Sequence, residues 1–562
     1  MQGSSSCLTH VPTAARTAFF RDLETSDSID VRGTSLHSDS FGELLQVIST
    51  RSASSPDPLA SISFDEVTFL GHVDFAATKF PAPTSFKGAT FAGRADFADC
   101  EFDFDVNFTC VTFHDQSAFT CARFRAANFW RSAFRDSTDF EQAKFTRAAG
   151  FSNSTFEHEA FFHGVLFEGH AYFSRVTFME DATFDESIFS TYADFSFSTF
   201  HGPYFGPFLC QGSVNLSRSH FTQSVSINLA ANKVVCDRTT WDGAATLRLR
   251  NANISLTNSV PISPISVTTH PTSFGEWHTH VDPNTKKAFI TNLSGFDCSM
   301  LSLVDIDLTS CRFFGAFHLD QIRLEGRHTF TGPPRGYGRA WFFPFSWSQR
   351  QVIEEERRWR VSFSRPVSLR AGWGDGSHRP SEVPSLEVLA ITYRQLRKAR
   401  EDAKDEPGAA DFYYGEMEMR RHSKGWGLGE RWLLQLYWLL SGYGLRASRA
   451  LGWLALAMMT TILLMMGFGL PQYSPKQEIV RERVDGEWKT FIDKDDPKNP
   501  TEDRFTTKRF DKALSVTLNS VVFRSSGQDL TTAGAYIEMA SRFSEPVLLG
   551  LAALAIRGRV KR

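Results

Sequence analysis

The sequence predicts a mainly β protein, in which a long solenoid of short stacked strands is followed by an α-helical hairpin and an α-helical membrane domain with two spans. Three observations support this fold class. Phenylalanine recurs in steps of five and six residues from position 64 to position 200, and a small residue stands two positions before nearly every one of these rings. Residues 451–470 contain no charged side chain, which suits a membrane span.

The phenylalanine spacing identifies the solenoid. Neither an α-helix, with about 3.6 residues per turn, nor a strand, with a period of about 2, produces these steps. The repeating unit is eleven residues with two phenylalanines, and one slip occurs near residues 124–134. Such self-similarity is typical of units that stack to bury a continuous core. The predicted core therefore includes Phe86, Phe97, Phe108, Phe140, Phe151, Phe162 and Phe173.

This pattern of a small residue, any residue and then phenylalanine resembles the pentapeptide-repeat family. The resemblance implies a right-handed quadrilateral β-helix with four faces per coil. The 26 regularly spaced phenylalanines then make roughly six coils, on the order of 30 Å long at about 4.8 Å per coil. The pattern weakens after residue 205 and returns at 293–324, so we expect the β-helix over 61–325, with an irregular insertion at about 231–290. Cys100 and Cys311 fall on small inward positions and are expected to be core thiols.

Three further segments flank the predicted β-helix. Residues 1–60 are rich in Ser and Thr and are expected to form a partly disordered N-terminal cap, since the ends of a solenoid must be covered. Residues 326–384 are rich in Gly and Pro, which predicts a loop-rich linker around one charged helix. Residues 385–430 show helical spacing on both sides of a Pro-Gly break, which predicts a helical hairpin.

Residues 431–562 are interpreted as a membrane domain. We expect an interfacial helix at 432–444, a first span at 451–470, a short re-entrant helix at 511–523 and a second span at about 533–556. This order resembles the two-helix pore domain of small ion channels. Residues 524–534, RSSGQDLTTAG, differ from the Thr-Val-Gly-Tyr-Gly filter of a potassium channel, so the resemblance does not extend to potassium selectivity.

The second predicted span carries Glu538, Arg542 and Glu545. The uncharged stretch 546–556 is too short to span a bilayer alone, so a crossing helix must include these charges. Spacings of four and three place them on one helical face. We expect this face to line a pore or to pack against the first span, with Arg542 paired to a glutamate. The alternative is a helix kinked at Pro546, with the charges in the outer interface.

Composition and motifs limit the function. The net charge is −3, and residues 61–205 carry 20 acidic against 10 basic side chains, so nucleic-acid binding is not expected. The motif HEAFFH at 158–163 resembles the metalloprotease motif His-Glu-x-x-His but has one residue too many. We find no catalytic constellation, and we expect no cofactor, no metal and no enzymatic activity.

We therefore predict a recognition rod coupled to a channel-like membrane domain that could conduct ions, with an unknown protein partner and a homo-oligomer if a pore forms. One alternative is a membrane-tethered acidic scaffold or DNA mimic, because some pentapeptide-repeat proteins imitate a duplex and bind gyrase. A membrane-associated oxidoreductase ranks last. We expect a multi-pass protein of the cell membrane, with the β-helix and the C-terminus in the cytoplasm. The positive-inside rule predicts this topology from the arginines at 446 and 449 and the basic residues at 557–562.

Overall fold

The structure is a computed structural model, and it describes residues 13–54, 59–270, 287–333, 350–363, 373, 383–425, 429–472, 477–484, 487–494, 497–498, 503–522 and 527–560. The chain divides into two compact units, Met1–Asp405 and Glu406–Arg562. Parts of the predicted cap, insertion and linker, including 271–286 and 334–349, lie outside the described residues.

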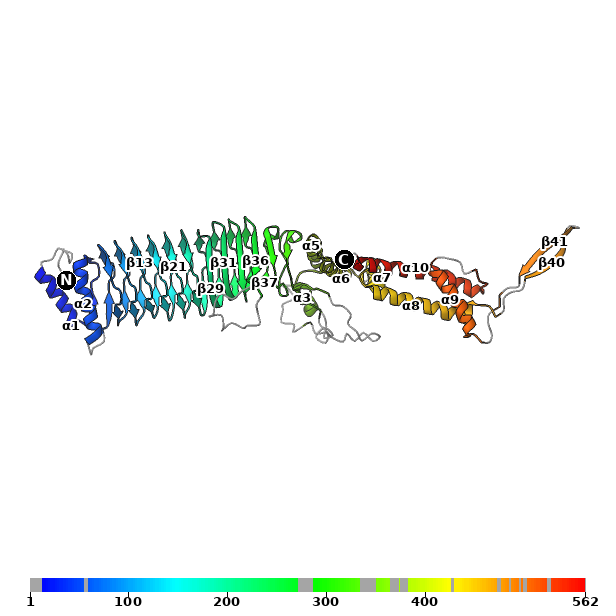
Figure 1. The fold of residues 1–562 in the computed structure, drawn as a ribbon, viewed down its shortest axis with the longest axis horizontal. Helices are drawn as coiled ribbons and strands as arrows, with labels where there is room; N and C mark the ends of the chain where they lie inside the picture. Colours follow the sequence, from blue (N-terminus) through cyan, green and yellow to red (C-terminus); the bar gives the residue numbers. More distant parts are fainter. Residues whose placement is uncertain are drawn as a thin grey trace. The chain divides into compact units, whose positions relative to one another are not determined.

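The first unit is dominated by a β-solenoid of about 11 turns (Figure 1). The strands from β4 (Thr68–Phe69) to β28 (Thr199–Phe200) are two residues long, apart from the three-residue β27 (Tyr192–Asp194). Each pairs in parallel with the strand one coil away; for example, Phe102 is opposite Phe124, which is opposite Phe145. The predicted β-helix is therefore confirmed, and its handedness stays a prediction.

Four columns of stacked phenylalanine rings fill the solenoid. Phe64, Phe69, Phe75 and Phe80 each stack on the ring one coil further along, at centroid distances of 4.6, 4.6, 4.8 and 4.6 Å. Rings of neighbouring columns meet edge to face, as Phe91 and Phe97 do at 5.8 Å, and rings of opposite columns do so across the core, as Phe97 and Phe108 do at 5.6 Å. The four columns explain the alternating steps of five and six, because each step moves the chain around one corner. All seven predicted core rings are fully buried: Phe86, Phe97, Phe108, Phe140, Phe151, Phe162 and Phe173.

The solenoid begins before residue 61. Strand β1 (Ser28–Asp30) pairs with β3 (Ser61–Ser63), and β2 (Ser35–Leu36) pairs with β4, so these two short strands belong to the ladder. The helices α1 (Thr13–Thr25) and α2 (Ser38–Ser54) lie at this end of the ladder (Figure 1). The ring of Phe41 in α2 meets Phe69 and Phe75 edge to face at 6.1 and 4.7 Å. The helix thereby covers the first ring layer, as a solenoid cap must.

Residues 231–269, where we expected an irregular insertion, continue the coil. Longer strands form here: β29 (Tyr204–Asn215), β31 (Val225–Val235), β33 (Ala245–Arg250), β34 (Asn253–Ser255) and β36 (Ile265–Thr269). The column positions hold Trp241, which stacks on Phe221 at 4.5 Å, and buried aliphatic residues such as Leu247 and Leu256. The phenylalanine pattern fades because the core changes side chains, while the ladder is kept through β37 (Phe289–Asn292), β38 (Leu301–Val304) and β39 (Arg323–Glu325).

Helix α3 (Glu354–Phe363), the predicted charged helix, is bound to the last coils by buried side chains. Both Phe313 and Phe314 donate backbone N–H groups to Glu355 Oε1, at 2.5 and 2.8 Å. The end of a solenoid exposes backbone N–H groups that have no partner strand. The Glu355 carboxylate accepts two of them, in place of the carbonyls that a further coil would supply. Burial raises the pKa of Glu355.

A second buried carboxylate, Glu356, ties α3 to α5 (Leu386–Asp402). It accepts hydrogen bonds from Arg350 and from the hydroxyl of Tyr393 in α5, and it forms an ion pair with Arg360 at 2.6 Å. Tyr393 OH in turn accepts the backbone N–H of Ile353 at 3.1 Å. Burial opposes ionisation here, but the two arginines outweigh it and keep the pKa of Glu356 below its ordinary value.

The second unit is helical. It contains α6 (Glu406–Ser423), α7 (Gly429–Ser441) and α8 (Ala447–Leu464), and α8 continues as a π-helical turn, η6 (Met465–Gly469). After an antiparallel hairpin, β40 (Gln477–Val484) with β41 (Glu487–Lys494), come α9 (Thr507–Val521) and α10 (Thr532–Val560). Helices therefore occur where the sequence predicts the interfacial helix, the first span, the re-entrant helix and the second span. The hairpin was not predicted.

Candidate functional site: the polar interface of two apolar helices

Two helical segments in the second unit are long and apolar enough to cross a membrane, Ala447–Gly469 and Thr532–Arg557. They pack against each other along their lengths (Figure 1). Their outward faces are rich in large apolar side chains that are 40% or more exposed: Leu451, Leu456, Met459, Leu463, Leu464, Phe543, Val547, Leu549, Leu554 and Ile556. Such contiguous exposed apolar surface is rare on soluble proteins.

The interface between α8 and α10 contains a buried carboxylate. Glu545 of α10 is fully buried, and its Oε1 accepts a hydrogen bond from Thr461 Oγ1 of α8 at 2.8 Å. Within the described part of the chain, Glu545 Oε2 has no hydrogen-bond partner. A buried charge is costly unless it is paired or neutralised. Glu545 is therefore a distinct polar site within an otherwise apolar helix interface. The sequence pattern included Glu545 but not Thr461, which only the packing brings to it.

The other two residues of the predicted face form an ion pair along α10. Arg542 donates to Glu538 Oε1 at 3.0 Å, one helical turn away. Their side chains are 31% and 13% exposed, so they lie at the edge of the helix pair, whereas Glu545 lies inside it. Helix α10 continues through Pro546. That this face lines a pore stays a prediction.

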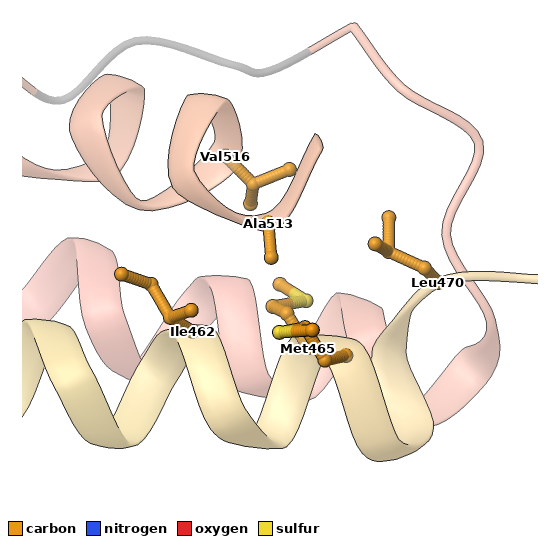
Figure 2. Close-up of a cluster of buried hydrophobic side chains, with 6 residues drawn as sticks. Ile462, Met465, Leu470, Ala513 and Val516 are labelled. Atoms are coloured by element: carbon orange, nitrogen blue, oxygen red, sulfur yellow. The ribbon is translucent and has the colours of Figure 1, made fainter. Parts of the chain in front are cut away.

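Helix α9 packs beside the end of α8. A cluster of buried side chains joins them, consisting of Ile462, Met465, Met466, Leu470, Ala513 and Val516 (Figure 2). Leu530 and Ile537 pack against the cluster, so the start of α10 takes part as well. In α9, the hydroxyls of Thr517 and Ser520 donate to carbonyls of their own helix, which allows these polar residues to be buried.

Arg509 of α9 closes the end of the π-helical turn. Its guanidinium donates to the carbonyls of Met466, Leu470 and Pro471 at distances of 2.7–3.3 Å. These carbonyls are the unpaired acceptors expected at a helix C-terminus, where a cation is favoured. Beside them is an open cleft of about 680 Å³, lined among others by Asp503, Lys508, Lys512 and Asp529.

The backbone of α10 crosses the π-helical turn at two glycines. A Cβ atom added to Gly534 would lie 2.3 Å from the carbonyl oxygen of Gly469. Thr531, just before α10, donates its backbone N–H to Gly469 O at 3.0 Å and its hydroxyl to Phe468 O at 2.7 Å. Close approach of two backbones through small residues is typical of membrane helix pairs.

We expect Gly534→Ala to lower the free energy of unfolding by roughly 1–3 kcal/mol, because the methyl group meets backbone that cannot move aside cheaply. Gly550→Ala in the same helix is the matched control, since its Cβ would meet nothing within 4 Å. Denaturation of the purified chain in detergent, followed by circular dichroism, measures both. Equal effects of the two substitutions would show that the glycine crossing is absent.

Other chemistry-bearing groups of the described chain lie apart from this interface. His158, Glu159 and Glu180 have ligand atoms within 4.8 Å of one another, but all three are exposed on the solenoid. The described cysteines are all free, and burial raises the pKa of Cys100 to about 12. Cys100 and Cys311 are buried, as predicted. In α6, Glu418 and Arg421 form a buried ion pair at 2.7 Å.

The fold and the helix pair define a β-solenoid protein with two candidate membrane spans. Residues 129–177 match the family described as pentapeptide repeats, in nine copies. The solenoid of this chain is therefore built from pentapeptide repeats, as the sequence pattern indicates. No curated protein and no solved structure matches the chain.

Proposed function

We propose that this chain is a membrane-anchored recognition protein, in which α8 and α10 cross the bilayer and the pentapeptide-repeat solenoid binds a partner. One observation supports the anchor most directly. The helix pair is apolar outside and polar inside, with Leu456, Met459 and Phe543 exposed and Glu545 buried. In water this arrangement leaves apolar surface uncovered, whereas in lipid it is the expected one.

Helix α7 fits the same proposal. Trp432, Leu433, Leu436 and Leu439 are exposed along one side of this helix at 61, 67, 56 and 42%. An amphipathic helix with tryptophan on its apolar side suits the membrane interface, beside the first span.

Charged substitutions on the outer face test the anchor. Leu456→Lys is expected to reduce membrane insertion by about 2.5–3.5 kcal/mol, because the new charge faces lipid. The matched control is Ile391→Lys in α5, which is equally exposed, 56% against 55%, but lies in the first unit. The measurement is the fraction of chain that stays with membranes after alkaline carbonate washing. If the wash removes both variants from the membrane, or if both remain bound as the parent chain does, α8 is not a lipid-facing span.

The proposed topology places the solenoid and the C-terminus in the cytoplasm. Arg446 and Arg449 precede the first span, and Arg557 and Arg559 follow at the end of the second, so the positive-inside rule puts both clusters on one side. A reporter fused to the C-terminus is expected to be active only on the cytoplasmic side. Activity outside the cell would exclude the two-span topology.

Ion passage is a second candidate function, and the buried Glu545 with the Glu538–Arg542 pair is the observation that favours it. Such groups at membrane depth commonly face a water path. A tetramer in detergent would support a pore, and a monomer would exclude a pore of the small-channel kind. Cysteine at Glu538 is expected to react with a membrane-impermeant thiol reagent and to change ion flux, whereas cysteine at the buried Glu545 should react slowly. Ready labelling without a change in the flux of a conducting protein would contradict the pore-lining role.

A further inference from the structure

One corner of the solenoid carries a line of arginines. At this corner the chain turns through a residue with left-handed backbone. In six successive coils these residues are Arg131, Asn153, Arg175, Phe197, Arg218 and Arg238, with φ between 57 and 62°. The strands just before the turn are in register from coil to coil. The line therefore covers about five coil steps, on the order of 24 Å.

The backbone holds this line in fixed positions. Arg131, Arg175 and Arg218 each donate their backbone N–H to a carbonyl in the next coil, at 3.1, 2.8 and 2.9 Å. The spacing of the side chains thus follows the pitch of the solenoid and does not depend on a loop. A preorganised row of charges loses less conformational entropy on binding than a mobile one.

Two exposed aromatic rings lie at this corner, Phe197 in the line and Trp130 beside it. Phe197 is 45% exposed, and the guanidinium groups of Arg175 and Arg218 lie over its ring, 5.3 and 5.1 Å from the centroid. Arg131 stands over the neighbouring Trp130 at 5.1 Å. A bulky residue with positive φ is unusual, and here the exposed ring positions two guanidinium groups without neutralising them.

Several basic side chains elsewhere on the solenoid are neutralised. Lys79, Arg94 and Lys144 form ion pairs with carboxylates. Among the described residues, Arg131, Arg175, Arg218 and Arg238 form no ion pair, and all four are exposed. On one side of the corner the equivalent strand residues are Ala133, Thr155, Thr177, Thr199 and His220. On the other side they are Asn128, Gly150, Tyr172, Asp194 and Asn215, and Asp237 directly precedes Arg238.

The other left-handed corner of the coil lacks arginines. The second left-handed column contains Ala77, Asp99, Cys121, Gln142, Gly164 and Glu186, and no basic residue. Between Arg131 and Arg238 the arginine column itself contains no carboxylate. A partner recognised at the arginine corner must be anionic and narrow enough to follow one edge of the rod.

We propose that this corner binds an extended, carboxylate-rich protein segment lying along the solenoid axis. Its guanidinium groups pair with side-chain carboxylates, and Trp130 and Phe197 contact the apolar residues between them. A short acidic peptide fits a single row of charges, whereas a nucleic-acid duplex would also meet the acidic faces of the rod. This proposal deepens the recognition role proposed for the solenoid, and it does not depend on whether α8 and α10 cross a membrane.

The test measures binding of a fluorescent glutamate-rich peptide to the purified full chain in detergent by anisotropy. Arg131→Glu, Arg175→Glu and Arg218→Glu together are expected to weaken binding at least about tenfold, and raised salt should weaken binding to the parent chain. Glutamate suits these positions, since Glu66 and Glu186 already occupy left-handed turns in this chain. Phe197→Asn is expected to weaken binding about threefold, because two guanidinium groups lose their platform; asparagine already occupies the same column at 153.

The matched control is Arg94→Glu, Arg123→Glu and Arg147→Glu, which changes the net charge equally on other sides of the same rod. Equal loss of binding in both triple variants would show that only net charge matters and would overturn the proposal. Tighter binding of a labelled single-stranded oligonucleotide than of the peptide would overturn the choice of a protein partner. Self-association that the corner variant abolishes would instead assign the corner to a second copy of the chain. The carbonate wash described above reports on the anchor separately.

Discussion

Replacing Phe140 with alanine is expected to lower the free energy of unfolding of the solenoid by about 3–5 kcal/mol. The ring is fully buried and stacks between Phe119 and Phe162 at 4.7 and 5.1 Å. It also meets Phe129 and Phe151 edge to face at 5.6 and 5.3 Å. Removing the ring leaves a void between coils whose strand ladder prevents collapse. Urea denaturation of the purified chain, followed by the β signal in circular dichroism, measures the change.

The adjacent Glu141→Ala is the control for Phe140→Ala. This side chain points away from the core and is only half-buried, so its removal should change the stability by no more than about 0.5 kcal/mol. Phe140→Leu should fall between the two, because leucine keeps part of the buried volume. If alanine at 140 and alanine at 141 have the same effect, the inward ring columns do not stabilise the solenoid.

A loss of similar size, about 3–5 kcal/mol, is expected for Glu356→Gln at the C-terminal end of the solenoid. Glutamine has nearly the same shape but no charge, so Arg350 and Arg360 would be left without their shared anion. The hydrogen bond from Tyr393 would also be weakened, which loosens α5 from α3. The same denaturation experiment applies, and detachment of α5 should appear as increased protease sensitivity near residue 402.

Glu355→Gln is the contrasting variant. Burial raises the pKa of Glu355, so the folded chain favours the protonated form, and this contribution to stability is lost as the pH rises through the raised value. Glutamine keeps an oxygen to accept the N–H groups of Phe313 and Phe314 and carries no charge. At neutral pH this variant should therefore be at least as stable as the parent chain. A loss as large as that of Glu356→Gln would refute the different roles assigned to these neighbouring carboxylates.

The sequence predicts best those parts of the fold in which the position of a residue within the repeat determines its environment. Phe86 and Phe140 lie in sequence-periodic columns, so their burial follows from spacing alone. The same reasoning failed where the periodic residue changed type. Leu36 takes a ring-column position opposite Phe69 in the first coil, and Leu247 does so further along, but aliphatic residues do not stand out as phenylalanine does.

The candidate site was predicted less completely, because its contacts join distant positions. Helical spacing placed Glu538, Arg542 and Glu545 on one face. It could not show that Glu545 would be buried against Thr461, which lies 84 residues earlier in the chain. Likewise, three consecutive glutamates at 354–356 indicate a solvated helix end until Arg350, Tyr393 and the last coil enclose them. Pairings of this kind depend on tertiary packing and leave no periodic signal.

The ladder of nearly identical coils also means that the length of the solenoid can change in steps of one whole coil. Because Phe102, Phe124 and Phe145 occupy equivalent places in successive coils, removing or adding one complete coil joins surfaces that already match. The distance between the cap formed by α2 and the closing helix α3 can therefore change in increments of about 4.8 Å with both ends unaltered. The solenoid can therefore be lengthened or shortened by whole coils during evolution, which changes the distance that it spans. A deletion of half a coil would instead misalign every ring column beyond it.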